Sequence, residues 1–391
     1  MKISVIATTG NGDKNFADNL GSKAAAVCYM RENFDVIQNE SADKTARRVT
    51  LTKASGHHSV YDHFAITLLL EDIPKLLAML LNNENDYTTS EKSARYTKMA
   101  TSGREKELYE KWLGIFKDKI VKAYANEPYV MKAAEKLAGE NARYIMSVLT
   151  PATTIVHTIS YRQFNVLYAF AKKMQGGTHP LAVAIAPALK EFCAELEKTG
   201  FVDEKLVEKA MERGGFSLFF GGNSGESGDF QGKSGGQNEV FGDVYLVKYR
   251  ASFAILAHLH RHRTIYYSMS LPDEAEFYIP PIIRDDAGLV EQWQSDMQSV
   301  ASTFPNGMMV DVVERGTIEK FIMKAKLRHC ARAQLEICNL TMDTMRRFYE
   351  KGDERISEMV RPYLGMRCTF KDFKCGEPCA FADGIRGTRR I

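Results

Sequence analysis

Two blocks of apolar positions along the chain each predict a strand followed by a helix. In residues 64–83, "FAITLLLED" is a strand-like apolar run, and "IPKLLAMLLNN" has helical spacing. In residues 244–263, "VYLVKYRA" is strand-like and "SFAILAHLHRHR" is helical for about three turns. We expect Asp72 and Ser252 to cap the two helices, because short oxygen-bearing side chains accept hydrogen bonds from the first turn. Pro74 suits the first turn of its helix.

A longer helical pattern follows in each part, from "ENARYIMSVL" onward and over residues 317–348. Between the two parts lies a glycine-rich stretch that is either a linker or a loop over a site. The pattern predicts an α+β fold of two tandem copies of one α/β unit, each a small sheet with long helices. The expected boundaries are 1–213 for the first repeat, 214–242 for the linker or loop, 243–350 for the second repeat and 351–391 for a C-terminal extension.

Composition restricts the class of protein. With 391 residues and 45% hydrophobic side chains, the chain can bury a sizeable core. Its formal net charge of +3 is too small for a partner that is bulk nucleic acid, and we see no extended basic stripe with interleaved aromatic residues. No apolar run is long enough to span a membrane or to act as a secretory leader, so we expect a cytoplasmic protein without a membrane partner.

The cysteines predict free thiols. There are seven, and an odd number in a chain of this length favours a reducing compartment over a disulfide framework. Cys368, Cys375 and Cys379 could be three metal ligands, but no fourth Cys or His follows at the usual spacing. We therefore expect no metal site.

The segment "HLHRHR", residues 258–263, concentrates histidine and arginine at one place. Three interpretations stay open on the residues alone. Cations in a last turn are stabilised by the helix dipole, and His258 and His262, at i and i+4, could share a metal ion. Alternatively, the consecutive residues Arg261 to Arg263 point in different directions and could contact several parts of a large anionic ligand.

The second part resembles the signature region of flavin-dependent thymidylate synthases. That family's signature is Arg-His-Arg, seven residues and a serine, within a longer pattern that ends in Ser-x-Arg-Tyr. Here Arg261, His262 and Arg263 match its start, but Leu271 stands in place of the serine and Asp273 in place of the next arginine.

The elements missing there occur in the first part. "SEKSARY" matches Glu-x-Ser-x-Arg-Tyr, and "GHHSVYDH" is similar to the family's Gly-His-x-Thr/Ser-x-x-Glu-His, with Asp62 in place of glutamate. In "ENARYIMSVLTPATTIVHTISYRQF", Arg143 and Arg162 fall on family arginines, and Ser160 replaces an asparagine. The second part in turn has "LRHCARAQLEI", which is similar to the family's Leu-Arg and Ala-Gln-x-Glu-Ile segment and contains Arg328.

The resemblance covers roughly residues 20–195 and 238–350. Each copy keeps what the other has lost. Since active sites of this family lie between subunits of a homotetramer, the resemblance implies a composite site between the two repeats. Two chains would supply the four units, so we expect a homodimer that forms a pseudo-tetramer.

The resemblance implies methylation of dUMP to dTMP with FAD as cofactor, methylenetetrahydrofolate as carbon donor and NADPH as reductant. Arg328 is the expected catalytic residue, placed against the pyrimidine. The residues implied to bind dUMP are His258, Arg261, Glu91, Ser93, Arg95, Arg143 and Arg328. Those implied to bind FAD are Ser59, Asp62, Arg162, Arg261, His262 and Arg263.

Two other functions stay open. His258 stands where the family usually has glutamine, and together with Ser160 this substitution is compatible with a flavin enzyme that acts on another pyrimidine nucleotide. Incomplete motifs are also compatible with a protein that binds nucleotide or FAD without turnover.

Overall fold

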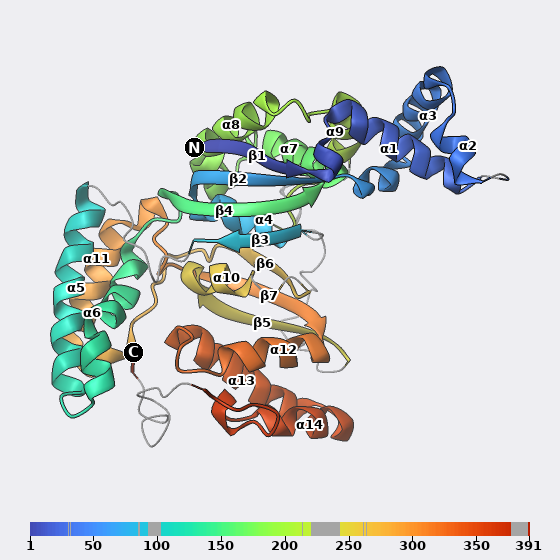
Figure 1. Cartoon of the computed structure of the whole chain (residues 1–391). Coiled ribbons are helices and arrows are strands. Elements are labelled where there is room, and N and C mark those ends of the chain that lie inside the picture. Colours follow the sequence, from blue (N-terminus) through green and yellow to red (C-terminus); the bar gives the residue numbers. More distant parts are fainter. Residues whose placement is uncertain are drawn as a thin grey trace. The chain divides into compact units, whose positions relative to one another are not determined.

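The protein is described by a computed structural model that covers residues 1–29, 31, 33–84, 87–92, 103–212, 214–219, 243–260, 262, 264–376 and 390–391 (Figure 1). The chain divides into two compact units. Unit 1 consists of residues 1–94 and 151–232, and unit 2 of residues 95–150 and 233–391. Both combine helices with a small antiparallel sheet, which confirms the predicted α+β class.

Unit 1 is built on a four-stranded sheet in the order β1-β2-β4-β3. Its strands alternate inward and outward positions, and in β2 the even-numbered residues Ile66, Leu68 and Leu70 are buried. The aromatic residues Phe64 and Phe201, with ring centroids 5.8 Å apart, belong to the core beside the sheet. The elements of unit 1 are β1 (Lys2–Thr8), α1 (Lys14–Val27), α2 (Phe34–Gln38), α3 (Ala42–Ser55), η2 (His58–His63), β2 (Ala65–Pro74), α4 (Lys75–Asn83), β3 (Tyr87–Glu91), β4 (Pro151–Ser160), α7 (Tyr161–Met174), α8 (Pro180–Lys198) and α9 (Glu204–Met211).

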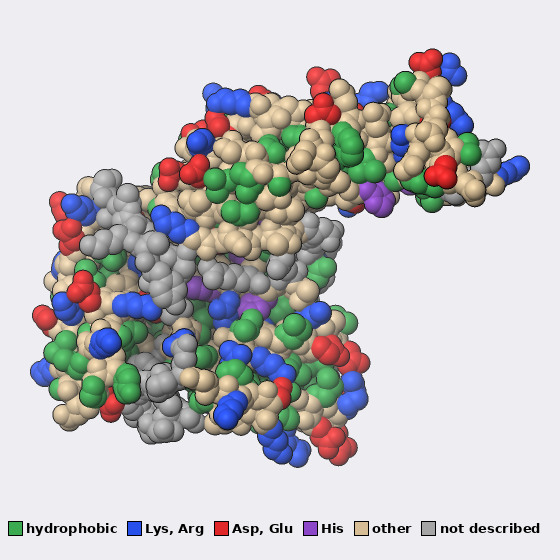
Figure 2. Space-filling model, in the orientation of Figure 1, with side chains coloured by type: hydrophobic (Ala, Val, Ile, Leu, Met, Phe, Trp, Pro, Cys, Tyr) green, Lys and Arg blue, Asp and Glu red, His purple; other side chains and the backbone are tan. Residues whose placement is uncertain are grey.

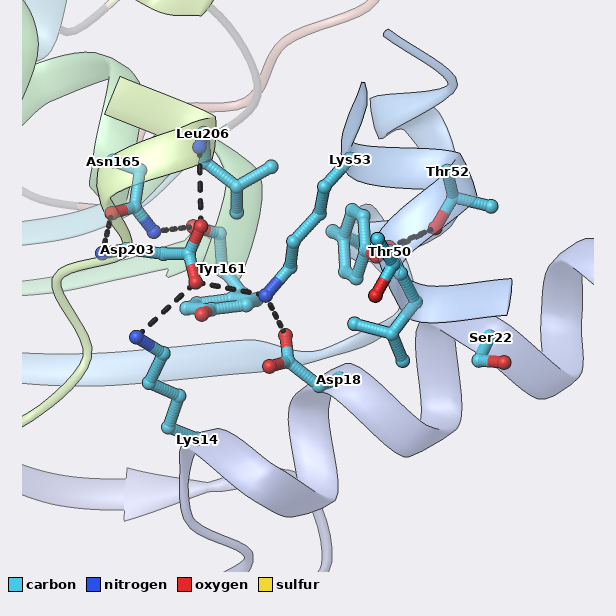
Figure 3. A network of polar contacts seen from close by, with 12 residues as sticks. Lys14, Asp18, Ser22, Thr50, Thr52, Lys53, Tyr161, Asn165, Asp203 and Leu206 are labelled. Carbon is cyan, nitrogen blue, oxygen red and sulfur yellow. Dashed lines mark hydrogen bonds and ion pairs between the residues drawn. The ribbon is translucent and has the colours of Figure 1, made fainter. Parts of the chain in front are cut away.

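A buried ion network joins four helices of unit 1 (Figure 3). Lys53 of α3 is 5% exposed, and its Nζ lies 2.6 Å from Asp18 of α1 and 2.8 Å from Asp203 at the start of α9. Asp203 also accepts the Leu206 amide at 3.1 Å, and its own amide donates to Asn165 of α7 at 2.7 Å. Burial opposes ionisation of Asp203, but the hydrogen bond and charge of Lys53 outweigh it and lower the pKa of Asp203. For Asp18 burial prevails and raises the pKa.

Unit 2 contains a three-stranded sheet, β5-β7-β6, and a separate layer of helices. Tyr245, Phe321 and Phe348 belong to the core cluster that β5 shares with α12 and α13, while Trp112 and Trp293 pack edge to face at 4.8 Å in the layer of α5, α6 and α11. The elements of unit 2 are α5 (Gly103–Ala123), α6 (Pro128–Ala142), η3 (Arg143–Ile145), β5 (Val244–Ser252), α10 (Phe253–Leu259), β6 (Tyr266–Ser270), η4 (Pro281–Ile283), α11 (Ala287–Ser299), β7 (Met309–Thr317), α12 (Ile318–Arg328), α13 (Leu335–Lys351) and α14 (Glu354–Val360).

The two units share one chain path. In unit 1, β2 leads into α4 and β3, and later β4 leads into α7. In unit 2, β5 leads into α10 and β6, and later β7 leads into α12. The last strand pairs antiparallel with both earlier strands in each case. This correspondence supports the predicted repeat. The predicted boundaries stay a prediction, and residues 95–150 of the expected first repeat fall in unit 2.

Several local predictions can be compared with the structure. Ser252 does cap α10, since its side chain accepts the Ile255 amide at 3.3 Å. Asp72 does not cap α4: the strand runs on to Pro74, and Asp72 has a φ of 53° at an irregularity in β2. The "ENARYIMSVL" helix ends at Ala142 and a strand follows at 151, so that part of the helical prediction was wrong.

The other two helical predictions were too long. The helix expected over 252–263 ends at Leu259. The one expected over 317–348 is interrupted between Arg328 and Leu335, where the amides of Cys330 and Ala333 form turns instead. The two helix ends are bonded to each other, since Arg328 donates to His262 and to the backbone carbonyl of His258.

Candidate functional site

Arg328 joins two of the sequence motifs in unit 2. It is the last residue of α12, and its Nε donates to His262 Nε2 at 2.9 Å. One terminal nitrogen of its guanidinium donates to the backbone carbonyl of His258 at 2.9 Å, in the last turn of α10. The segment that contains "LRHCARAQLEI" is thereby bonded to the segment that contains "HLHRHR", although the bonded residues are 66 positions apart.

This contact bears on two interpretations of the basic segment, the shared metal ion and the anionic ligand. A guanidinium has no acceptor, so the ring nitrogen of His262 must accept and that imidazole is neutral in this arrangement. His262 lies beyond Leu259, where α10 ends, so His258 and His262 do not occupy one helical face as the metal interpretation requires. The contact instead fixes the direction of a permanently charged arginine, which suits an anionic ligand.

A buried ion pair lies one helical turn before Arg328. Lys324 Nζ is 2.8 and 2.7 Å from the two carboxylate oxygens of Glu314, and the two residues are 1% and 0% exposed. Tyr245 and Tyr249 each donate to Glu314 at 2.6 Å. Burial lowers the pKa of Lys324, and the charge of Arg328 acts in the same direction, while Glu314 opposes both.

We did not predict this pair from the sequence, although a signal was present. β7 alternates, with Val310, Val312 and Glu314 at inward positions. A carboxylate at the third inward position of a strand requires a buried cationic partner, because an isolated buried charge is strongly disfavoured. Lys324, on the following helix, is that partner.

In unit 1, Asp62 and Arg162 form a bidentate pair, with Arg162 Nε 2.9 Å and a terminal nitrogen 2.7 Å from the two oxygens of Asp62. Ser160 Oγ donates to Asp62 at 2.5 Å and accepts the Gln163 amide at 3.1 Å, so it also caps α7. The two positions that depart from the family pattern, Asp62 and Ser160, therefore contact each other. The side chains of Asp62 and Arg162 are 35% and 27% exposed, which leaves both accessible to a ligand.

The structure also describes three other predicted site residues, Glu91, Ser59 and Arg143. Glu91, at the end of β3, is paired with Lys75 and accepts a hydrogen bond from Asn82 at 3.5 Å. Ser59 is exposed in η2, and Arg143 is partly buried where α6 ends. The structure thus brings His258, His262 and Arg328 together, and separately Asp62 and Arg162. Four predicted residues lie outside the described part of the chain: Ser93, Arg95, Arg261 and Arg263.

The end of α4, where the first part reads "NNE", is covered by its own chain. Ser217 Oγ accepts from Asn83 at 2.8 Å and donates to Glu84 at 3.0 Å, and the Ser217 amide donates to Glu84 at 2.7 Å. Phe216 and Leu218 beside it are buried. Burial raises the pKa of Glu84, which these hydrogen bonds oppose. This helix end therefore has an internal partner in place of a cationic cluster.

Charges and thiols add no further site in the described residues. On the face shown in Figure 2, basic and acidic side chains are interspersed over both units. Cys368 and Cys375 are exposed, and Cys379 lies outside the described residues. The described residues contain no group of three His, Cys, Asp or Glu side chains that could hold a metal ion. No described helix is both long enough and apolar enough to cross a bilayer.

Comparison with known proteins supports the family resemblance over part of the chain. The family model of the thymidylate synthase complementing protein, the family of flavin-dependent thymidylate synthases, matches residues 11–191. The match covers just under half of the chain, so the resemblance to this family is established for residues 11–191. The predicted family is thereby confirmed, whereas residues 243–350, the predicted second repeat, lie outside the match. No curated protein matches the chain.

Solved structures of this kind are similar at low identity. Thymidylate synthase X from Helicobacter pylori with FAD and dUMP is 15% identical, covers 54% of this chain and 100% of its own, and has a TM-score of 0.34. A UMP/dUMP methylase, PolB from Streptomyces cacaoi bound with 5-Br dUMP, is 15% identical, covers 57% and 97%, and has a TM-score of 0.33.

The side chains present fit FAD. Unit 1 offers a half-exposed guanidinium, carboxylate and hydroxyl in Arg162, Asp62 and Ser160, which can bond to the polar groups of a dinucleotide. Unit 2 offers the fixed cation of Arg328 beside His262, which can stabilise an electron-rich ring.

Proposed function

We propose that this protein methylates dUMP to dTMP, with FAD as cofactor, methylenetetrahydrofolate as carbon donor and NADPH as reductant. The family match supports the reaction class. The observation that carries the proposal is the bond between Arg328 and His262, which joins two separate motifs of the resemblance at one cationic centre.

Arg328 is the proposed catalytic residue. Its guanidinium is held at two nitrogens, so its charge has a fixed direction and needs no reorganisation when charge develops. Placed against the pyrimidine, it stabilises the electron-rich form of the ring and makes C5 a better nucleophile. His258 and Arg143 are proposed to contact the nucleotide, together with Glu91, Ser93, Arg95 and Arg261.

The proposed FAD residues are Ser59, Asp62, Arg162, Arg261, His262 and Arg263. When bound, FAD supplies the hydride that reduces the transferred carbon. The bidentate contact between Asp62 and Arg162 keeps the guanidinium in one plane, so the chain presents an ordered set of polar groups to the cofactor.

We also propose that each site is composite, because the two parts of the sequence keep complementary motifs. The corresponding assembly is a homodimer with two competent sites. Light scattering tests the mass, and the composite site is tested by mixing chains that carry Arg328→Ala with chains that carry Arg162→Ala. Recovery of activity on mixing would require that residues from different chains can complete one site.

The reaction itself is tested with purified full-length protein. We expect bound FAD that NADPH bleaches, and release of tritium from dUMP labelled at C5 when methylenetetrahydrofolate is present. Arg328→Ala should lower tritium release at least 100-fold, since loss of one preorganised charge or donor costs about 10²–10³ in rate. Arg346→Ala, an exposed pair with Asp343 on α13, is the matched control and should retain full activity.

A second function is favoured by one substitution. His258 stands where glutamine is usual, and Arg328 donates to its backbone carbonyl, so the substituted side chain belongs to a residue in direct contact with the proposed catalytic arginine. UMP and other pyrimidine nucleotides should therefore be assayed beside dUMP. Binding of FAD and dUMP without tritium release from any of them would indicate a binding protein and contradict the proposed enzyme.

A further inference from the structure

Glu336, in the first turn of α13, is a buried carboxylate with three hydrogen-bond donors. The Ser252 amide donates to one oxygen at 2.9 Å, and Ser252 Oγ donates to the other at 2.7 Å. Tyr144 Oη donates to that second oxygen at 2.8 Å, and Gln334 Nε2 donates to Tyr144 Oη at 2.6 Å. All four residues are at most 8% exposed.

These partners lie on the elements that present the proposed nucleotide residues of unit 2. Ser252 is the N-terminal cap of α10, the helix that contains His258. Tyr144 directly follows Arg143 in η3. Glu336 itself begins the helix that follows Arg328. One carboxylate is therefore bonded, directly or through one residue, to the elements that carry His258, Arg143 and Arg328.

The hydrogen bonds match the ionised form of Glu336. Ser252 Oγ accepts the Ile255 amide, so its hydroxyl proton is available to Glu336. An ionised carboxylate accepts only, and here it meets three donors. A protonated carboxyl would add a fourth proton among these groups, and one of the donors would lose its acceptor.

The groups around Glu336 set its titration. Burial raises the pKa of Glu336 to about 7, while the donors from Ser252 and Tyr144 and the charge of Arg284 oppose this rise. Tyr144 stays a donor, because burial and then the charge of Glu336 raise its own pKa. The Tyr278 ring, 4.7 Å from the Tyr144 ring, covers the remaining side.

We propose that Glu336 is a positioning residue. Its hydrogen bonds fix the start of α10 and the turn that carries Arg143, and their loss loosens both and weakens nucleotide binding. This inference rests on the proposed function for its consequence at the nucleotide, but its structural part can be measured without any turnover.

Hydrogen exchange tests the structural part in Glu336→Gln, which keeps the size but removes the charge and places a donor among donors. Peptides that cover residues 252–260 should exchange about tenfold faster than in the unsubstituted protein at pH 8, as loss of about one hydrogen bond predicts. Equal exchange of α10 at pH 8 would overturn the proposal.

Asp296→Asn is the matched control. Asp296 is a buried carboxylate of α11 that accepts Trp112 Nε1 at 2.9 Å, in the helical layer of the same unit. We expect faster exchange in α5 and α11 but none in α10. If Asp296→Asn accelerates α10 as much as Glu336→Gln does, the effect is general destabilisation and the positioning role is wrong.

Kinetics then test the consequence. Glu336→Gln should raise the KM for dUMP. Ser252→Ala should raise the KM in the same direction, and Ser252→Thr, which keeps the hydroxyl, should restore it. An unchanged KM in Glu336→Gln would contradict the proposal. Absence of FAD binding and of tritium release in the unsubstituted protein would instead refute the proposed function, and the exchange result would still decide the positioning role.

Discussion

Lys324→Met should destabilise unit 2 strongly, because it removes one member of a fully buried ion pair. Lys324 Nζ is 2.7 and 2.8 Å from Glu314, and neither residue is more than 1% exposed. Removal of one partner leaves an uncompensated buried charge, which costs about 3–5 kcal/mol. Two tyrosine hydroxyls still donate to Glu314 after the change, so we expect about 3 kcal/mol, near the lower end of that range.

Intrinsic fluorescence reports this unit selectively. The chain has two tryptophans, Trp112 and Trp293, and both are fully buried in the helical core of unit 2. Urea unfolding followed by tryptophan fluorescence should therefore show a lower midpoint for Lys324→Met at an unchanged slope. Lys326→Met is the control, since its pair with Asp372 has side chains 36% and 48% exposed and should cost at most about 1 kcal/mol.

A double variant shows whether the cost of Lys324→Met comes from the uncompensated charge of Glu314. Glu314→Gln combined with Lys324→Met removes both charges, so it should be more stable than Lys324→Met alone. A cost below about 1 kcal/mol for Lys324→Met, or a double variant as unstable as the sum of the single changes, would refute the reasoning.

Three further changes test other parts of the fold. The pKa of Glu336 is raised from 4.5 to about 7, so its contribution to the stability of the fold is complete below pH 4.5 and is lost as the pH rises through 7. Glu336→Gln should remove about 3 kcal/mol of this pH dependence. The measurement is the difference in unfolding free energy between pH 5 and pH 8. Asp203→Asn leaves Lys53 with one carboxylate and should cost about 2–3 kcal/mol by urea unfolding followed by far-UV circular dichroism. Since the pKa of Asp203 is lowered, this contribution should persist above pH 3.8 and be lost in stronger acid, and an equal cost at pH 2 would contradict it. Ser217→Ala removes a hydroxyl donor from Glu84 and should cost about 1 kcal/mol, with faster hydrogen exchange at the end of α4; unchanged exchange there would show that the contact does not hold the helix end.

Neighbouring residues in the chain determined the features that the sequence could predict. The cap at Ser252 follows from a hydroxyl three residues before a helical amide, and the alternating strands follow from a two-residue period. The family resemblance rested on short motifs such as "GHHSVYDH", and the family match over residues 11–191 confirmed it. The division into repeats stays a prediction, supported by the shared order of strands and helices in the two units.

Tertiary structure decided which of these residues meet. The bond from Arg328 to His262 spans 66 positions, the contact of Asn83 with Ser217 spans 134, and Tyr144 reaches Glu336 across 192. No local period encodes such distances, and the periodicity continued two helices beyond their ends at Leu259 and Arg328. Capping and amphipathic spacing depend on a few adjacent residues, whereas a buried polar group takes the partner that the packed chain brings within about 3 Å of it.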